Sequence, residues 1–183
     1  NTASATSGNG VTATATNVSY MSAVQANGTI GFTLASDDLA DSGGSAAISA
    51  AVTTSDYSAL VTQINANFSA TGIIAEAVVM SAGDAGVKLT QVDGKDITIG
   101  TFVNSTGTGT IEVGKSATTA SNTTVTEAAA TDSARLMGAV SISSSQGVIT
   151  AVAALGSTTA TATSTSASLA SLTVATATSA TNA

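Results

Sequence analysis

The stretch DYSALVTQINANFSATGIIAEAV, Asp56–Val78, decides the fold of this chain. Its apolar residues recur at the spacing of a helix that buries one face. The members of that stripe are Tyr57, Leu60, Val61, Ile64 and Phe68. Ser55 is a suitable N-cap ahead of the acidic Asp56, and Gly72 can end the helix in the left-handed conformation. We therefore predict an amphipathic helix over about residues 55–70.

Three strands are predicted to follow this helix. They are Ile73–Met80, Val87–Gln91 and Ile97–Phe102. SAGDAG separates the first two strands, and VDGKD, with a turn at Asp93-Gly94, separates the last two. A helix followed by an antiparallel meander forms a small α+β unit, with the helix across one face of the sheet. Burial of Ile64 or Phe68 would contribute about 1.5–3 kcal/mol each, so the helix is expected to be a main source of core.

The flanking zones are rich in Thr, Ser and Ala and predict further strands. VTATAT, Val11–Thr16, alternates with period two, and Asn27-Gly28 suits a tight hairpin turn. Ala134–Ser143 and Gly147–Leu155 form two strand candidates with SSQG as the turn between them. Thr158–Ser168 is of low complexity; an edge strand and a loosely ordered segment both fit, and we favour an extended one. The predicted class is α+β, mostly β, with antiparallel strands and hairpins and one amphipathic helix.

Two domain organisations fit a chain of 183 residues. In the first, a proximal β-rich lobe consists of residues 1–35 plus 127–183, and residues 36–126 form an inserted distal lobe with the helix and the meander. In the second, the chain is one elongated domain. We favour the first, because both ends of the sequence have the pattern of paired strands that enter and leave a domain.

Composition excludes several classes of function. The chain has no Cys, His, Pro or Trp, and only 4 Lys and Arg against 11 Asp and Glu. The commonest general base and metal ligand is thus missing, as are thiolates and a basic patch for nucleic acid. The sequence shows no apolar run of about 18 residues and no signal-peptide pattern. Leu, Ile, Val and Phe make up about a fifth of the chain, which predicts a thin core. We expect no enzyme, no cofactor, no nucleic-acid partner and no membrane partner.

The candidate sites are few, and each has a structural alternative. Asp37, Asp38 and Asp41 could bind calcium, but they lack EF-hand spacing, and a solvated loop explains them as well. Asp93 and Asp96 fit turn residues better than a catalytic pair. No catalytic, cofactor-binding or metal-binding residue is therefore assigned.

Some surface features are also predictable. Glu76 can pair with Lys88 or Lys95 across neighbouring strands, for about 0.2–1 kcal/mol. Asn-x-Ser/Thr sequons begin at Asn17, Asn67, Asn104 and Asn122, and a chain rich in Ser and Thr contains such triplets by chance. O-linked glycans on exposed Ser and Thr are a further expectation, without assigned positions.

The order of motifs resembles the central region of bacterial flagellins. Their pattern has an "IN" helix, a "TGI/V-A" strand and "L-T/S…G-x-D-I-x-I"; here Ile64-Asn65, Thr71–Ile73 and Leu89–Ile99 match it. GNGVTATATNVSYMSAVQANGTIGFTL resembles the stretch by which flagellins enter their outer domain, and ARLMGAVSISSSQGVITAV the return. LASLTVATATSATNA resembles the segment before their C-terminal helix. The long terminal helices that polymerise flagellins have no counterpart in this sequence.

The resemblance implies a surface-exposed outer domain of a flagellar filament, extracellular, serving motility and in contact with other flagellin subunits. The receptor site of flagellins would lie on the missing helices, so no residue is assigned to it. A module of another secreted surface protein, such as a filament cap, an adhesin or a surface-layer protein, is the alternative. Flagellins with a protease in this region need two His for its zinc motif, and this chain has none.

Overall fold

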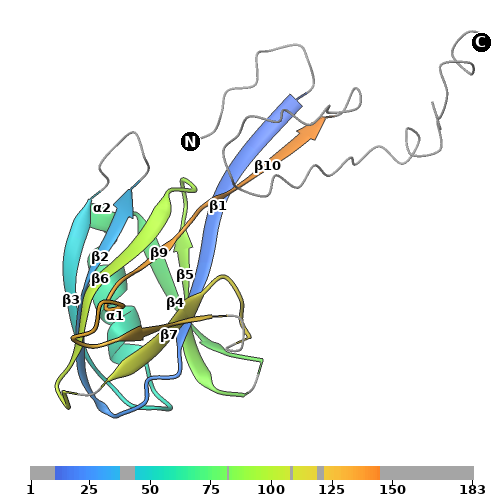
Figure 1. The fold of residues 1–183 in the computed structure, drawn as a ribbon. Coiled ribbons are helices and arrows are strands. Elements are labelled where there is room, and N and C mark those ends of the chain that lie inside the picture. The colour runs from blue at the N-terminus through green and yellow to red at the C-terminus, as the bar shows by residue number, and fades with distance from the viewer. Residues whose placement is uncertain (1–10, 38–43, 82, 108, 119–121, 145–183) are drawn as a thin grey trace, which may run out of the picture. The chain divides into compact units, whose positions relative to one another are not determined.

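The computed structural model describes residues 11–37, 44–81, 83–107, 109–118 and 122–144. Figure 1 shows the order of its elements. They are β1 (Val11–Ser22), β2 (Gly28–Asp37), β3 (Ser45–Val52), α1 (Ser58–Ala66), α2 (Phe68–Thr71), β4 (Ile73–Val79), β5 (Ala85–Gln91), β6 (Asp96–Asn104), β7 (Thr110–Gly114), β8 (Thr123–Thr126), β9 (Ala134–Leu136) and β10 (Ala139–Ser144).

The strands form two sheets. One has the order β4-β5-β1-β7-β8, with β10 also pairing β1, and the other has the order β3-β2-β6-β9. The pairings whose register is defined are all antiparallel. The predicted class, α+β and mostly β, is confirmed.

The chain divides into two compact units. Ala15–Gly138 forms the larger one, and Asn1–Thr14 with Ala139–Ala183 forms the other. Within the larger unit, β2 pairs with β3 and β6, and β1 pairs with β5 and β7. The lobes predicted from the sequence would divide this unit at 35/36 and 126/127, and that division stays a prediction. In the smaller unit the described residues are 11–14 and 139–144.

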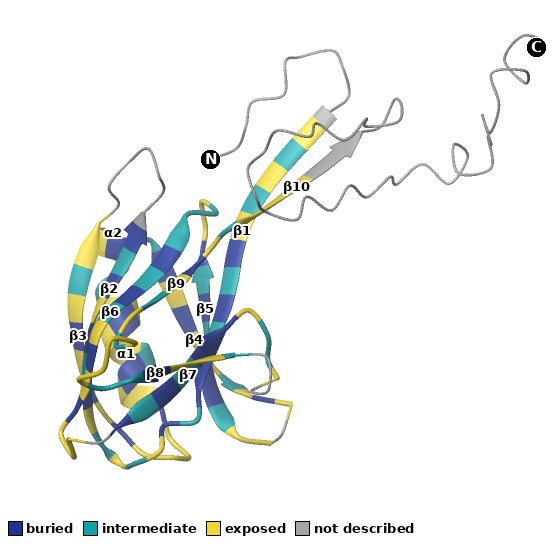
Figure 2. Cartoon of the chain, viewed as in Figure 1, coloured by how far each residue is buried: buried dark blue, intermediate teal, exposed yellow. Residues whose placement is uncertain are grey.

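Helix α1 packs against both sheets of the larger unit. It contacts β3 in one sheet and β4 in the other, and its Leu60 and Ile64 are fully buried. Figure 2 shows buried positions along the strands around it. The sheets contribute the other large buried side chains, among them Met21, Leu89 and Ile111 from one sheet and Ile30, Leu34, Ile48 and Ile99 from the other. The helix was expected on one sheet, but it fills the space between two.

The helix differs from the prediction at both ends. It begins at Ser58 with Tyr57 as N-cap, and Ser55 is not the cap. Instead, Asp56 accepts a hydrogen bond from the Ser58 amide at 2.8 Å, which holds the pKa of Asp56 below its ordinary value. Phe68 was expected to be buried but is 43% exposed, because the helix breaks at Asn67 and Phe68 begins the separate helix α2.

The predicted left-handed end of the helix is confirmed at Gly72, where φ is 65°. Strands β4 and β5 form the predicted hairpin, and Gly94 turns the chain after β5 with φ of 72°. The third strand of the expected meander is wrong, because β6 leaves β5 and pairs with β2 and β9. Apolar alternation identifies a strand but does not encode its partner.

The hairpin predicted at Asn27-Gly28 is also wrong, because β1 and β2 belong to different sheets. The Asn27 side chain instead accepts a hydrogen bond from the Thr54 amide at 2.9 Å. The strand predicted over Ala134–Ser143 is divided into β9 and β10. Gly147–Leu155 and Thr158–Ser168 lie outside the described residues.

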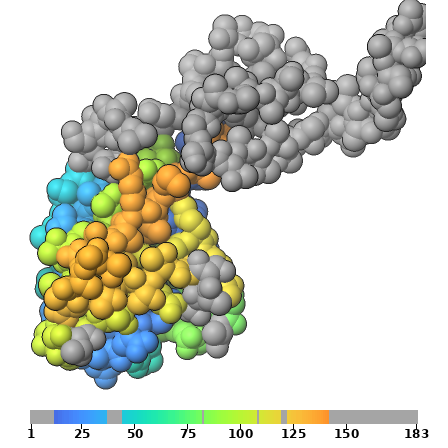
Figure 3. All heavy atoms as spheres, viewed as in Figure 1, coloured from blue at the N-terminus to red at the C-terminus, as the bar shows by residue number. Residues whose placement is uncertain are grey.

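The segment of residues 122–138, which follows β7, covers part of the larger unit. In Figure 3 the orange atoms that include β9 and the preceding turn lie across the viewed face. The turn is attached to the sheet beneath it, because the Phe102 amide donates to the Asp132 carbonyl at 2.9 Å. Val125 of β8 and Leu136 of β9 are buried in the core cluster. This segment therefore completes the core rather than extending away from it.

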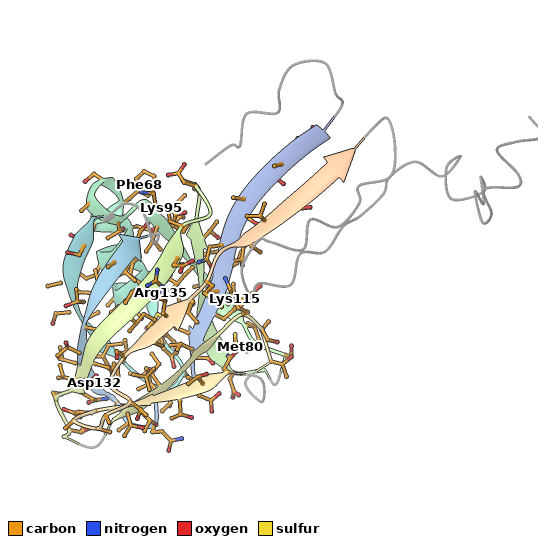
Figure 4. All side chains as sticks on the ribbon, turned by 45° about the horizontal axis from the view of Figure 1, so that its top comes forward. Phe68, Met80, Lys95, Lys115, Asp132 and Arg135 are labelled. Atoms are coloured by element: carbon orange, nitrogen blue, oxygen red, sulfur yellow. The ribbon has the colours of Figure 1, made fainter. Side chains whose placement is uncertain are left out.

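Substitutions at Ile64 and Phe68 test this helix placement. Ile64→Ala is expected to lower the free energy of unfolding by about 2–5 kcal/mol, because it opens a cavity between the sheets. Phe68→Ala is expected to cost no more than about 1 kcal/mol, because Phe68 lies at the periphery in Figure 4. Urea unfolding monitored by circular dichroism measures both values. Equal losses would contradict the placement.

Candidate functional site

Asn65 of α1 holds the backbone of edge strand β4. Its side-chain Oδ1 accepts from the Ala75 amide at 2.8 Å, and its Nδ2 donates to the Ala75 carbonyl at 3.0 Å. The carboxamide thus makes the two bonds that a neighbouring strand would make at Ala75. Thr71 Oγ1 accepts from the Ile73 amide at 3.3 Å on the same strand. The helix is therefore attached to β4 through directional bonds as well as apolar contact.

Tyr57, the N-cap residue of α1, binds the link between β1 and β2. Its buried phenol oxygen accepts from the Val24 amide, in the link between β1 and β2, at 3.0 Å. Burial raises the pKa of Tyr57 above its ordinary value, the Val24 bond acts in the opposite direction, and the charge of Asp84 adds to the rise. The phenol therefore favours its neutral form in the folded protein.

A buried polar junction joins the two sheets where β1 crosses the larger unit. Asn17 of β1 is fully buried. Its Nδ2 donates to the Lys95 carbonyl at 2.9 Å and to the Leu136 carbonyl of β9 at 2.7 Å. Ser19 Oγ donates to Asn17 Oδ1 at 2.9 Å. Since β1 and β9 belong to different sheets, this one amide fixes one sheet to the other.

Lys115 completes the junction from the segment after β7. Its ammonium donates to Asn17 Oδ1, to the Val18 carbonyl at 3.3 Å and to Ser19 Oγ at 3.2 Å; Figure 4 labels it beside β1. Burial lowers the pKa of Lys115, and the charge of Asp96 opposes that shift. Four atoms of β1 and the Lys115 ammonium are hydrogen-bonded to one another or to nearby carbonyls at this junction. The junction therefore has a structural role and is not an open binding site.

The chain enters and leaves the larger unit at one place. The Asp96 carboxylate accepts from Arg135 Nε and from the Gly138 amide, both at 2.8 Å. Gly94 lies between the two ends. A Cβ on Gly94 would collide with Ala15 Cβ, and a Cβ on Gly138 would collide with the Gly94 carbonyl oxygen. The first and last residues of this unit, Ala15 and Gly138, therefore contact the same turn.

Two further buried side-chain amides close turns. Gln91 Oε1 accepts from the amides of Asp93 at 2.9 Å and Lys95 at 2.8 Å. Asn104 Oδ1 accepts from the Thr106 amide at 3.1 Å, and its Nδ2 donates to the Ala26 carbonyl at 3.3 Å. Sequence reasoning missed these roles, because Asn and Gln within strands give no signal of the backbone groups that they reach.

The structure describes only some of the residues weighed as sites from the sequence. Asp37 ends β2, and Asp38 and Asp41 lie outside the described residues. Asp93 belongs to the turn after β5, whereas Asp96 begins β6 and binds Arg135. Among the described residues no group of three or more Cys, His, Asp or Glu could hold a metal ion. No helix in that part of the chain is long and apolar enough to cross a membrane.

The predicted ion pair between Glu76 and Lys88 is confirmed. The two residues are directly opposite in the β4–β5 register, with Lys88 Nζ 3.1 Å from Glu76 Oε2. Among the sequons, Asn17 and Asn104 are buried and their amide nitrogens are engaged, so neither can carry a glycan in the folded protein. O-linked glycosylation stays a prediction.

The comparisons with known proteins give no family for this chain. No family model matches the sequence, and no curated protein matches it. The arrangement of the residues themselves is therefore what bears on function. That arrangement consists of amide and ionic contacts that fix a β-rich unit at the point where the chain enters and leaves it.

Asn65→Ala tests the attachment of α1 to β4. Loss of the carboxamide leaves the Ala75 amide and carbonyl without their protein partners, at an expected cost of about 1–3 kcal/mol in the free energy of unfolding. Asn67→Ala is the matched control, since it removes only an exposed bond to the Gln63 carbonyl and should cost under about 0.5 kcal/mol. Urea unfolding measures both, and equal costs would contradict a special role for Asn65.

Alkaline titration tests the environment of Tyr57. Its pKa is 10.0 when unfolded and higher when folded, so its contribution to stability is complete below about pH 10. This contribution is lost as the pH rises through the folded pKa. The lowered pKa of Lys115 acts with the opposite sign, because folding then favours the neutral amine. The unfolding free energy of the native chain should therefore fall more steeply above pH 10 than that of Tyr57→Phe; parallel pH profiles would contradict this.

Proposed function

We propose that this chain is the surface-exposed outer domain of a bacterial flagellin, a structural component of the extracellular flagellar filament that serves motility. The structural observation that most supports this proposal is that Ala15 and Gly138 contact the same turn at Gly94. A unit whose two ends meet can be inserted into a host subunit without separating the host segments on either side. The resemblance of the helix and its following strands to the flagellin "IN" motif supports the same proposal.

The bonds at the ends of the larger unit suit a domain carried on a rotating filament. Asn17 joins the strand that enters to β9, and Asp96 binds the Gly138 amide where the chain leaves. A drag force on the unit would act through these two strands. Because each is bonded to the body of the unit at its point of attachment, the unit resists peeling from its ends. Other flagellin subunits are the proposed partners, and exposed Ser and Thr are proposed carriers of O-linked glycans.

The alternative proposal is a module of another secreted surface protein, such as a filament cap, an adhesin or a surface-layer protein. Adjacent ends and a β-rich body suit such a module equally well. The resemblance of the return segment, which in flagellins leads toward a C-terminal helix, favours flagellin over the filament cap. The two proposals differ in where the chain is found on the cell.

Immunogold electron microscopy distinguishes these locations. Antibodies raised against the purified chain should label flagellar filaments along their length on the source bacterium. Deletion of residues 15–138 from the parent gene, with Thr14 joined to Ala139, should leave filaments that still assemble, because the ends of the unit already lie together, and that bind much less of the antibody. Label confined to filament tips or to the cell body would contradict the flagellin proposal and support the alternative.

The purified chain itself is not expected to form filaments. Flagellins polymerise through long terminal helices, and the residues that resemble flagellin here do not include them. Most large apolar side chains of the described residues are buried in the core. Electron microscopy and light scattering at high protein concentration check this expectation. Regular filaments of the purified chain would show that assembly contacts lie within these 183 residues.

A further inference from the structure

Lys115 binds a buried amide rather than a carboxylate. Lys88, by comparison, pairs with Glu76. Among the described residues the Lys115 ammonium has no ion pair, and it donates instead to Oδ1 of Asn17. Asn17 is fully buried and lies 98 residues away in the sequence, whereas Lys115 as a whole is exposed. A side chain that starts at the surface therefore ends on an amide that solvent does not reach.

This contact brings together the two reactants of an amide exchange. A lysine nitrogen is a nucleophile in its neutral form, and the Cγ atom of an asparagine is the electrophilic carbon of a carboxamide. Because Lys115 Nζ is hydrogen-bonded to Asn17 Oδ1, Cγ lies only one covalent bond beyond the contact. Well-oriented groups held this close react as if at roughly 10⁵–10⁸ M.

We propose that Lys115 and Asn17 form an intramolecular isopeptide bond, which links β1 covalently to the segment that follows β7. The lone pair of the neutral amine forms a bond to Asn17 Cγ, and the carbonyl electrons move to Oδ1. The proton that Nζ loses reaches Nδ2 by way of this oxygen. The Cγ–Nδ2 bond then breaks, Nδ2 leaves with the bonding electrons as ammonia, and the carbonyl forms again. The products are one secondary amide and one ammonia, so the exchange needs no oxidant or cofactor.

The groups around the Asn17 carboxamide suit these steps. Ser19 Oγ donates to Oδ1 at 2.9 Å, where negative charge develops, and so acts as an oxyanion donor. The same hydroxyl accepts from Lys115 Nζ at 3.2 Å, so it can take a proton from the attacking nitrogen while it gives its own to the oxygen. Nδ2 donates to the carbonyls of Lys95 at 2.9 Å and Leu136 at 2.7 Å. These two acceptors favour a nitrogen that gains protons as it leaves.

Burial favours the exchange over competing reactions. It lowers the pKa of Lys115 below its ordinary value, against the opposing charge of Asp96, and so raises the fraction of neutral amine. Since Asn17 is fully buried, water does not compete with the amine for Cγ. The exposed side of Lys115 gives the released ammonia a way out.

The bond closes residues 17–115 into one covalent loop. A force on β1 then acts on a covalent bond between this strand and the segment after β7, in addition to the hydrogen bonds of the sheet. A cross-link over a long loop also restricts the unfolded chain and thereby stabilises the folded one. The bond depends on the contacts of this junction alone, whether or not the chain is a flagellin.

Intact-mass spectrometry of the purified full chain tests the bond directly. The native chain should be lighter than its sequence mass by one ammonia. Lys115→Arg keeps the positive charge but removes the nucleophilic amine, so this variant should have its full mass. Lys88→Arg is the matched control and should still lack one ammonia. A native chain of full mass would overturn the proposal. Loss of ammonia from Lys115→Arg as well would also overturn it, because the ammonia would then come from another reaction, such as cyclisation of an asparagine with its own backbone.

Trypsin digestion of the denatured native chain gives an independent readout. Trypsin cuts after a free lysine but not after an acylated one. Cleavage should therefore occur after Lys88 and be absent after Lys115, and the peptide that contains Lys115 should stay joined to the one that contains Asn17. Complete cleavage after both lysines would overturn the proposal. Because the purified chain is used, this result is separate from the labelling that tests the flagellin assignment.

Discussion

The paired bonds between the Asn65 carboxamide and the Ala75 backbone are the constraint on which the rest of the larger unit depends. They set the position of α1 along β4 and its rotation about its own axis. With the helix so placed, Leu60 and Ile64 point into the space between the sheets. Apolar contact alone tolerates sliding, whereas two directional bonds to one residue do not. The chain has few large apolar side chains, so these directional hydrogen bonds supply positioning that a larger apolar core would supply in another protein.

The same economy explains the buried polar groups. Buried amides stabilise a fold only when their hydrogen-bonding groups are satisfied. Asn17 and Asn104 are bonded to backbone groups of other segments, and Gln91 is bonded to the turn that follows it. Each one therefore fixes a turn or a sheet end that a larger core would hold by packing. The result is a β-rich unit whose two chain ends contact one turn. That arrangement suits a body displayed at a surface, and it is the physical basis for the flagellin proposal.

The sequence predicted those elements whose periodicity and end signals agree. Helix α1, its left-handed end at Gly72, and the hairpin with Glu76 opposite Lys88 belong to this group, because a short turn fixes the register. It did not predict the break at Asn67, which exposes Phe68, because the apolar spacing continues across the break. Strand β3 was not predicted, since Ala and Ser give little strand signal. The role of Asn65 was hidden for another reason: a polar residue beside a buried helix position has the pattern of a solvated one, although it binds a strand.

Amide hydrogen exchange by NMR tests the central claim most directly, because two amides depend on side chains of this helical stretch rather than on a strand. The Ala75 amide bonds to Asn65 and the Val24 amide bonds to Tyr57. Both should exchange only through global unfolding, with protection equal to that of β5 amides such as Leu89. Exchange of Ala75 and Val24 at the rate of exposed loop amides, while Leu89 stays protected, would show that the helix does not hold the sheets and would contradict the account.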